Sequence, residues 1–280
     1  MSIMFNLAGS AKDVAGLRVN VGGQAKEASK VLLNVGGVAK EIYTSVRYLS
    51  LGEGGTVNLQ TWLNGQGYTS GEIDITVTGN RIADTYSVYA ISTGDLTAFR
   101  KVRLNIAAGV HVLGRGGNGG RQASDGTRGG DAFVVDSTAA GKLIVSNQGV
   151  IAGGGGGGGG GATATGSTTA YGGSGGGGRP YGVGGAATGS GSTGGKPGGS
   201  GSLTSSGGGG AGGNVSGLAY AGAGASGGGL GANGGTGGAK TGHSGWGSTR
   251  RGLGGAAGKA VVGDANIIWE NLGTIYGART

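Results

Sequence analysis

The first 50 residues repeat one pattern of apolar and polar positions three times. Asn6, Asn20 and Asn34 each begin a phrase of the form N-[LV]-[AG]-G-x-A-K-[DE], so the phrase returns every 14 residues. Apolar and polar residues alternate before each pair of small residues. This alternation, followed by a glycine-containing turn and a second polar run, predicts a β-hairpin in each unit. The apolar positions that carry the pattern are Leu17, Val19, Val21, Leu33, Val35 and, at the end of the third unit, Ile42.

An isolated hairpin is only marginally stable in water, so the three units are expected to pack against something. One interpretation joins them into a small sheet. The other notes that three equal units in one chain could meet the three equal faces of a homotrimer. The sequence leaves both open.

Residues 51–113 are predicted to form a compact β region. Turns are indicated by Gly65–Gly67, Gly79-Asn80 and Gly94-Asp95, because glycine, asparagine and aspartate favour turns. Trp62 is the one tryptophan of this region. Alternation between these turns predicts strands over Thr56–Leu63, Glu72–Thr78, Tyr86–Ile91 and Val102–Leu113.

The alternation disappears at residue 114, where a long glycine field begins. Glycine accounts for 78 of the 280 residues, and Gly153–Gly161 is an unbroken run. Ordering a backbone costs roughly 1–2 kcal/mol per residue, and glycine has no side chain to bury in return. The field must therefore be either a flexible linker or a structure held by backbone hydrogen bonds.

Two features favour an ordered field. Short inserts punctuate it, and the phrases Asn147–Gly153 and Asn271–Gly277 frame it with the same pattern, N-x-G-[VT]-I-[AY]-G. Neither feature is needed in a linker. In polyproline-II geometry the chain makes three residues per turn without internal hydrogen bonds, so glycine helices can approach closely and bond to one another. A Cβ is then tolerated only on outer faces and at turns.

We therefore predict a mostly β and irregular fold without an α-helical core. Hairpin repeats occupy residues 1–50, the β connector 51–113, and a polyglycine-II sandwich with framing β segments 114–280.

Composition excludes several functional classes. The chain has no cysteine, and no Asp or Glu lies between Ser137 and Gly263, so paired-carboxylate catalysis and calcium-binding glycine repeats are not expected there. His111 and His243 have no ligand-spaced partners. We expect no enzyme activity, no cofactor, no metal, no membrane span and no signal peptide, with synthesis in a host cytoplasm. The net charge of +8 suits an anionic partner such as a lipopolysaccharide phosphate or an acidic protein loop.

Three stretches resemble a known family: Val102–Gly120, Gly141–Ala152 and Gly175–Gly185. Over roughly residues 57–280 the chain is similar to the glycine-rich adhesins at the tips of long tail fibres in T-even-type bacteriophages. The resemblance implies a polyglycine-II sandwich of about ten helices and distal loops that recognise a receptor on the bacterial outer membrane. It also implies a virion location and an N-terminal part that binds the tip of a trimeric fibre, one copy per fibre. Residues 1–50 depart from the family pattern. The candidate fibre-attachment residues are Leu17, Val19, Val21, Leu33, Val35, Ile42 and Trp62.

If successive glycine tracts cross the sandwich in alternate directions, the inserts sort into two ends. The proximal turns are Arg179–Tyr181, 202–206 and 232–233. The distal inserts are 121–125, 162–171, about 190–197, 214–221 and 239–251. Aromatic residues and arginine dominate binding interfaces, so the receptor-binding candidates are the distal residues Gln122, Ser124, Thr168, Tyr171, Lys196, Tyr220, His243, Trp246, Arg250 and Arg251. The alternative role for the tyrosines and tryptophan is to cap the open end of the stack.

Three other functions fit parts of the composition. A glycine-rich structural or surface protein would not need the 14-residue units. An ice-binding polyglycine-II protein would carry threonine along its helices, whereas threonine here clusters in the inserts. RNA binding is suggested by Arg115-Gly-Gly and Arg128-Gly-Gly, but these lack interleaved aromatic residues, so no nucleic-acid partner is expected.

Overall fold

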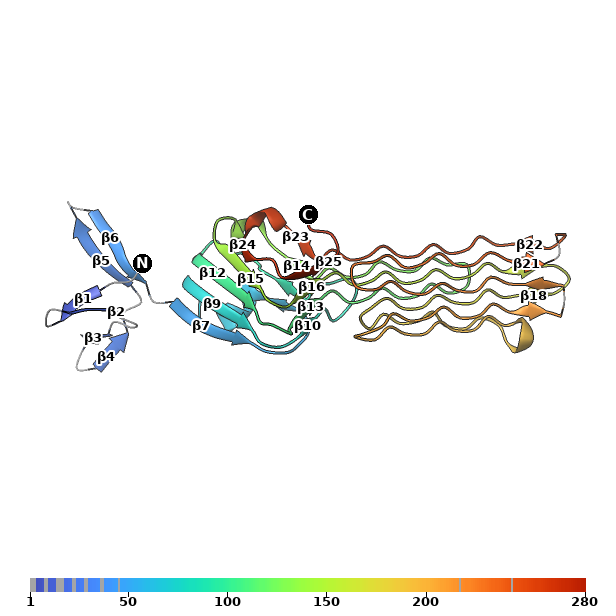
Figure 1. Cartoon of the computed structure of the whole chain (residues 1–280), viewed down its shortest axis with the longest axis horizontal. Helices are drawn as coiled ribbons and strands as arrows, with labels where there is room; N and C mark the ends of the chain where they lie inside the picture. The colour runs from blue at the N-terminus through green and yellow to red at the C-terminus, as the bar shows by residue number, and fades with distance from the viewer. Residues whose placement is uncertain are drawn as a thin grey trace.

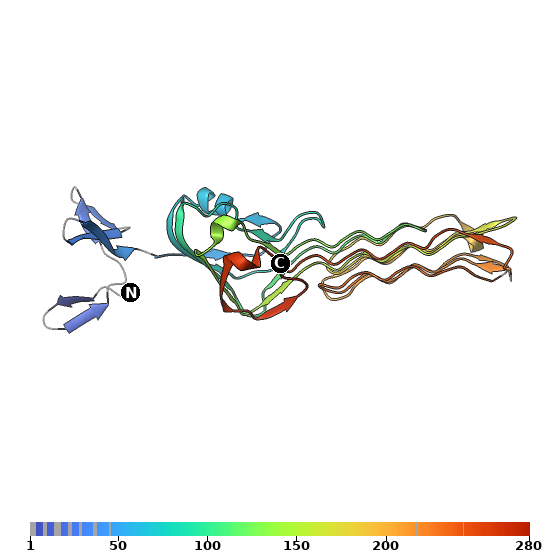
Figure 2. The same ribbon diagram turned by 90° about the horizontal axis from the view of Figure 1, so that it is seen from above.

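The computed structural model describes residues 4–7, 10–13, 18–21, 24–27, 30–35, 38–44, 46–216, 218–242 and 244–280. From residue 46 onward it consists of a β-rich body from which long, nearly straight glycine tracts extend (Figures 1 and 2). Most regular elements are strands, and the single α-helix of the described part is α1 (Leu59–Gly65). The fold is thus mostly β and irregular without a helical core, as the sequence predicted. No helix in these ranges is long and apolar enough to cross a membrane.

The body is a parallel β-solenoid with three faces. Within each sheet every pair of neighbouring strands is parallel. Sheet 1 contains β7 (Val46–Leu51), β9 (Gly71–Val77), β12 (Phe99–Ile106), β15 (Leu143–Asn147) and β24 (Ile267–Asn271). Sheet 2 contains β10 (Arg81–Ile82), β13 (His111–Leu113), β16 (Val150–Ala152) and β25 (Thr274–Tyr276). Sheet 3 contains β8 (Val57–Asn58), β11 (Ile91–Ser92), β14 (Phe133–Val134) and β23 (Val261–Val262).

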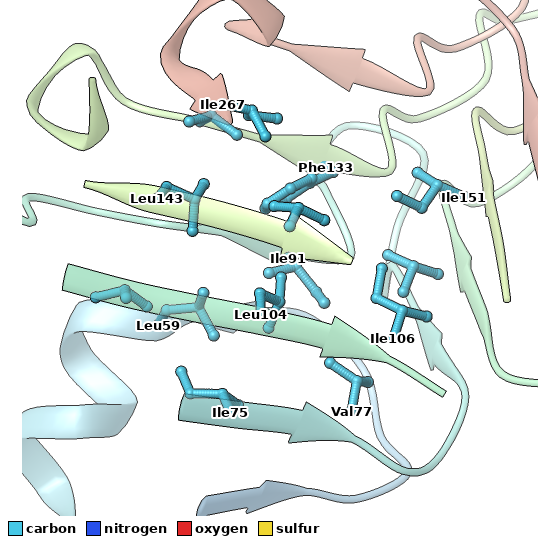
Figure 3. Close-up of a cluster of buried hydrophobic side chains, with 14 of the residues drawn as sticks. Leu59, Ile75, Val77, Ile91, Leu104, Ile106, Phe133, Leu143, Ile151 and Ile267 are labelled. Carbon is cyan, nitrogen blue, oxygen red and sulfur yellow. The ribbon is translucent and has the colours of Figure 1, made fainter. Parts of the chain in front are cut away.

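Each coil visits the three sheets in the same order, as in β9, β10 and β11 and then β12, β13 and β14. Alternate residues of sheet 1 point into the solenoid, for example Ile73, Ile75 and Val77 on β9. Side chains from all three sheets and from α1 meet in one buried cluster (Figure 3). Short 3-10 helices, η1 (Ser137–Ala139) and η3 (Asp264–Asn266), turn the chain from sheet 3 back to sheet 1.

Several predicted strands differ from the observed ones. Thr56–Leu63 was only partly right as a strand. Val57–Asn58 forms β8, but Asn58 then caps helix α1: its Oδ1 accepts a hydrogen bond from the Thr61 amide at 3.0 Å. Tyr86–Ile91 was also wrong, since only Ile91 enters a strand and the rest forms a turn-rich corner. Val102–Leu113 divides into β12 and β13 at a turn where Gly109 has a φ of 79°. Glu72–Thr78 matches β9 closely.

The strands before β7 pair antiparallel in three hairpins. These are β1 (Met4–Leu7) with β2 (Ser10–Asp13), β3 (Arg18–Val21) with β4 (Gln24–Glu27), and β5 (Lys30–Val35) with β6 (Val38–Thr44). Each pair is a separate two-stranded sheet among the described strands, so these strands do not join into the single sheet that was one of the two interpretations.

The glycine field leaves the solenoid at the corner between sheets 2 and 3. It does so twice, after β13 and again after β16, and the chain returns to β14 and to β23. The framing phrases Asn147–Gly153 and Asn271–Gly277 each run from the end of a sheet 1 strand through the corner into sheet 2, in consecutive coils, where β16 and β25 pair in parallel. Their sequence similarity therefore reflects an equivalent position in the fold.

Backbone hydrogen bonds in the field follow a period of three. Along the central tract 153–162, every third amide donates to the same neighbouring tract, and the intervening amides serve two other tracts. Three residues per turn is the repeat of a polyproline-II-type helix. One series runs from Gly154 to Gly130, from Gly157 to Thr127 and from Gly160 to Ser124; a second runs from Gly155 to Arg179, from Gly158 to Gly176 and from Gly161 to Gly173; a third runs from Gly156 to Ala232, from Gly159 to Gly235 and from Ala162 to Gly238.

The glycines 153–161 of the central tract have no room for side chains. A Cβ on Gly156 would lie 1.9 Å from the Gly255 carbonyl oxygen, one on Gly157 would lie 1.9 Å from that of Asn118, and one on Gly158 would lie 2.1 Å from that of Ala225. A real Cβ atom does not lie this close to a carbonyl oxygen. Any residue other than glycine at these positions would therefore push the neighbouring tracts apart.

Candidate functional site

The loops at the far end of the tracts assemble into two small sheets. One contains β17 (Ala164–Thr165) between β18 (Thr169–Ala170) and β22 (Gly247–Ser248). The other contains β20 (Ala219–Tyr220) between β19 (Asn214–Val215) and β21 (Thr241–Gly242). Segment 239–251 supplies one strand to each sheet and so links the other two loops (Figure 1). We call the loops 162–171, 214–221 and 239–251 the tip.

The tip has its own small apolar cluster. Ala164, Ala170, Ala219 and Ala221 are buried, and Trp246 packs against them while remaining partly exposed. A Cβ on Gly166 would lie 2.5 Å from the Trp246 ring, so the indole lies directly over that glycine. Trp246 therefore has an internal packing partner, which is the arrangement expected of a capping side chain.

The most exposed large apolar side chains of the tip are in segment 214–221, where Leu218 lies just before β20 and Tyr220 lies on it. Tyr220 is 49% exposed and Leu218 is 50% exposed. Thr168 is also exposed, on the turn between β17 and β18. The sequence reasoning missed Leu218, although it is the largest aliphatic residue in any distal insert and that alone is a signal of a contact residue.

The turn 121–125 contacts the base of the tip through polar groups. The Gln122 side-chain amide donates to the Thr163 hydroxyl, and the Ser124 carbonyl accepts the Gly160 amide at 2.9 Å. Asp125 forms a two-point ion pair with Arg250, with N–O distances of 3.0 and 3.2 Å, and accepts the Leu253 amide at 2.7 Å.

These contacts favour the charged forms of both Asp125 and Arg250. Hydrogen bonds from Arg250 and then from the Leu253 amide lower the pKa of the Asp125 carboxyl. The same carboxylate raises the pKa of Arg250. The guanidinium of Arg250 thus has an intramolecular partner, whereas Arg251 is exposed beside it. Sequence reasoning overlooked Asp125, the only acidic residue in the distal inserts.

The remaining distal candidates lie around the segment with η2 (Gly191–Thr193). Tyr171 is half-buried, its amide donates to the Thr193 carbonyl at 2.8 Å, and its ring fills the space that a Cβ on Gly189 would need. Lys196 is exposed. His243 lies outside the described residues.

The proximal turns lie at the solenoid end of the tracts. At Arg179–Tyr181, the Arg179 side chain donates to the Leu203 carbonyl of the neighbouring turn. Tyr181 is 40% exposed, with the Arg115 guanidinium 5.9 Å from its ring centre.

Of the predicted attachment residues, Val19 and Val21 lie in β3, Leu33 and Val35 in β5, and Ile42 in β6. Leu17 is outside the described part of the chain. Trp62 is half-buried on α1 and packs against the solenoid core.

A second polar surface lies on the outer face of sheet 1. Tyr48 is 78% exposed there, beside Asp74, which accepts from Asn105 at 2.6 Å. Burial raises the pKa of Asp74, and this outweighs the opposing effect of Arg103. No group of His, Cys, Asp or Glu within the described ranges is arranged to hold a metal ion.

Comparison with known proteins identifies relatives of the chain. The sequence model of the phage tail fibre adhesin Gp38 family matches residues 44–280. Among solved structures, the chain is similar to the gp37–gp38 adhesin tip complex of the bacteriophage S16 long tail fibre. Sequence identity is 31% and the TM-score is 0.58, and the alignment covers 85% of this chain and 83% of that chain.

Proposed function

The chain belongs to the phage tail fibre adhesin Gp38 family, and from this membership we propose that it binds a receptor on the outer membrane of a host bacterium through the tip. The product is accordingly a virion protein that acts in attachment, and family and fold both point to adhesion instead of catalysis. The ligand would be an outer-membrane protein or lipopolysaccharide.

One observation carries this proposal. Exposed apolar and polar side chains, among them Leu218, Tyr220 and Thr168, gather on loops at the end of a scaffold that is otherwise almost free of side chains. Binding residues are typically found on loops that a rigid framework holds in position. Aromatic side chains among Ser, Gly and Thr are also typical of binding loops.

We further propose that the glycine tracts are polyglycine-II helices packed as a sandwich. The threefold periodicity of the hydrogen bonds and the absence of space for Cβ atoms support this. A hydrogen-bonded lattice of this kind holds the tip without a hydrophobic core. Ice binding would need a repeated threonine surface along the tracts, and a measurement of thermal hysteresis distinguishes that alternative.

The other end of the chain is proposed to join a tail fibre. The solved relative is a complex of gp38 with gp37, and a similar contact would place one copy of this chain at a fibre tip. We assign attachment to residues 1–50 and connection to 51–113, with adhesion in 114–280. The 50/51 boundary falls within β7, which pairs with β9, so the separable N-terminal part ends before residue 46.

The test measures adsorption of purified protein to host cells, including strains that lack single outer-membrane proteins or carry truncated lipopolysaccharide. Tyr220→Ala is expected to reduce affinity by about 1–2 kcal/mol without changing the melting temperature, because Tyr220 is exposed at the tip. Tyr181→Ala removes a tyrosine of similar exposure at the opposite end and serves as the control, with no change in adsorption. If the control alone abolishes adsorption, receptor binding is at the proximal end.

A further inference from the structure

The outer face of sheet 1 contains a hollow that receptor binding by the tip leaves unexplained. It lies on the solenoid, at the other end of the glycine tracts from the tip (Figure 1). Its volume is about 330 Å³, and residues of β7, β9 and β12 line it. These strands are neighbours in the sheet, so their outward side chains form rows across it. The hollow is therefore built on regular sheet structure and not on a loop.

One aromatic side chain stands at the edge of this hollow. Tyr48 lies on the edge strand β7, in register with Asp74 of β9. It is 78% exposed, and no large apolar side chain among the described residues is more exposed. A tyrosine ring offers a flat apolar surface with one polar group at its rim. Packing of the solenoid does not account for Tyr48, because folding leaves most of it in contact with solvent.

The polar groups beside Tyr48 are held in fixed positions. Asp74 Oδ1 accepts the side-chain amide of Asn105 at 2.6 Å, whereas Oδ2 is 3.7 Å from Arg103 Nε. The second distance is longer than a hydrogen bond. The Arg103 guanidinium also donates to Glu270 of β24, so it is held from both sides. Asp74 therefore keeps one oxygen that can accept a hydrogen bond from a ligand.

The hollow contains both signs of charge in equal number. Glu72 and Asp74 supply two carboxylates, and Lys101 and Arg103 supply two cations. This balance disfavours a polyanion, which binds where positive charge is in excess. Carboxylates accept hydrogen bonds, ammonium and guanidinium groups donate them, and a hydroxyl group does both. A ligand with many hydroxyl groups can therefore bind all four side chains.

We propose that this hollow is a second binding site, and that its ligand is an uncharged saccharide chain. The apolar C–H groups on one face of a sugar ring lie against Tyr48. Its hydroxyl groups donate to Asp74 and accept from Arg103, while Glu72 and Lys101 bind the next sugar in the same way. The site differs from the tip in place and in ligand. Its natural source, which rests on the proposed function, is the polysaccharide of the host surface.

The experiment titrates the full chain with one probe. The probe is the polysaccharide that mild acid releases from the lipopolysaccharide of the host, with its phosphate groups removed. Isothermal titration calorimetry gives Kd, and thermal melting shows that each variant is folded. Tyr48→Ala is expected to raise Kd about tenfold, the effect of losing one well-placed aromatic contact. Tyr48→Phe keeps the ring and is expected to raise Kd less, and Asp74→Asn weakens binding because the amide replaces an accepting oxygen by a donor.

Two controls match Tyr48→Ala. One row of paired residues crosses the sheet from Tyr48 to Ile268, which is 47% exposed at the opposite edge. Ile268→Ala therefore removes an exposed apolar side chain from the same face outside the hollow. Tyr220→Ala removes the exposed tyrosine of the tip. Both are expected to leave Kd for the probe unchanged.

Four results would overturn the proposal. The first is an unmodified chain that does not bind the probe, and the second is binding that Tyr220→Ala abolishes and Tyr48→Ala leaves intact, which would place the saccharide at the tip. In the third, only the phosphorylated polysaccharide binds, so the ligand is an anion. The fourth comes from repeating the titration with the chain bound to its tail fibre: loss of saccharide binding there would make the fibre the occupant of the hollow.

The proposed receptor function is tested separately, by adsorption to host cells that lack this polysaccharide. Tyr48→Ala is expected to adsorb to those cells as well as the unmodified chain does, because the tip is unchanged. If the unmodified chain does not adsorb to any host cell, receptor binding by the tip fails, and the titration still decides the saccharide site.

Discussion

At the scale of single residues, the glycines of the field differ sharply in what they permit. A Cβ on Gly207 would lie 1.9 Å from the carbonyl oxygen of Gly199, but one on the adjacent Gly208 would have no atom within 4 Å. The Gly199 carbonyl also accepts the Gly177 amide at 2.9 Å, so moving it disturbs a second tract. The two neighbours therefore form a matched pair for testing the lattice.

We expect Gly207→Ala to destabilise the protein by about 1–3 kcal/mol, because it forces hydrogen-bonded tracts apart. Gly208→Ala is expected to be neutral or to stabilise by up to about 1 kcal/mol, since it restricts only the unfolded chain. Chemical denaturation with a spectroscopic probe of the folded state measures both. Equal effects of the two substitutions would contradict the packed-tract description.

Trp246 shows where residue-level reasoning from sequence reaches its limit. Its size and its place in the longest insert made it a receptor-binding candidate, and both features are equally true of a capping residue. Only the contact with Gly166 and the buried alanines distinguishes the internal role, and those residues come from different loops. A receptor contact by the exposed edge of Trp246 stays a prediction, to be measured alongside stability.

At the scale of elements, the turn 121–125 is fixed to the tract beginning at Arg250 by the Asp125 carboxylate. Because the pKa of Asp125 is depressed on folding, its contribution is fully present above the ordinary value of 3.8 and is lost as the pH falls through the lower folded-state pKa. The ion pair is exposed, and high salt is expected to weaken it.

Asp125→Asn is therefore expected to accelerate hydrogen exchange at the Leu253 amide, which donates to this carboxylate. Acidification of the unmodified protein is expected to lower the Leu253 protection factor only at pH values below the ordinary pKa of aspartate. The Gly255 amide, which donates to Gly157 in the same tract, provides the internal reference and is expected to change little. Identical loss of protection at both amides would indicate that the whole tract detaches.

The local alternation of apolar and polar residues predicted only some of the strands correctly. The run Glu72–Thr78 alternates and forms β9, but Thr56–Leu63 alternates as well and forms a helix after Asn58. The asparagine cap was visible in the sequence, and its side-chain hydrogen bond decided the outcome. Tyr86–Ile91 failed for another reason: it lies at a corner of the solenoid, where the chain must bend whatever its alternation.

At the scale of the whole molecule, the three-faced winding was not predictable from local signals. It depends on pairs such as β15 with β24, whose strands are separated in sequence by the entire second excursion of the glycine field. Similarity between Asn147–Gly153 and Asn271–Gly277 was the one long-range signal. It marked segments that pair side by side, as β16 and β25.

Removal of residues 1–44 is expected to leave the rest of the molecule folded, because β7 and all later strands pair without the hairpins. The melting temperature should stay within a few degrees of that of the full chain, and adsorption to cells should persist. Association with the tail fibre is expected to disappear. Calorimetry, cell adsorption and co-purification with the fibre measure the three properties. Retained association would assign the joint to residues 46–113 instead.

The near absence of side chains in the glycine tracts also has a calorimetric consequence. Unfolding a normal domain exposes apolar surface, which raises the heat capacity, whereas exposure of peptide groups lowers it. The tracts would expose mainly peptide groups, while the solenoid would expose its apolar core. The part formed by the glycine tracts and the tip should therefore have an unusually small heat-capacity change of unfolding per residue. Its free energy of unfolding should accordingly depend only weakly on temperature. Its resistance to unfolding would then vary little over a wide range of temperatures.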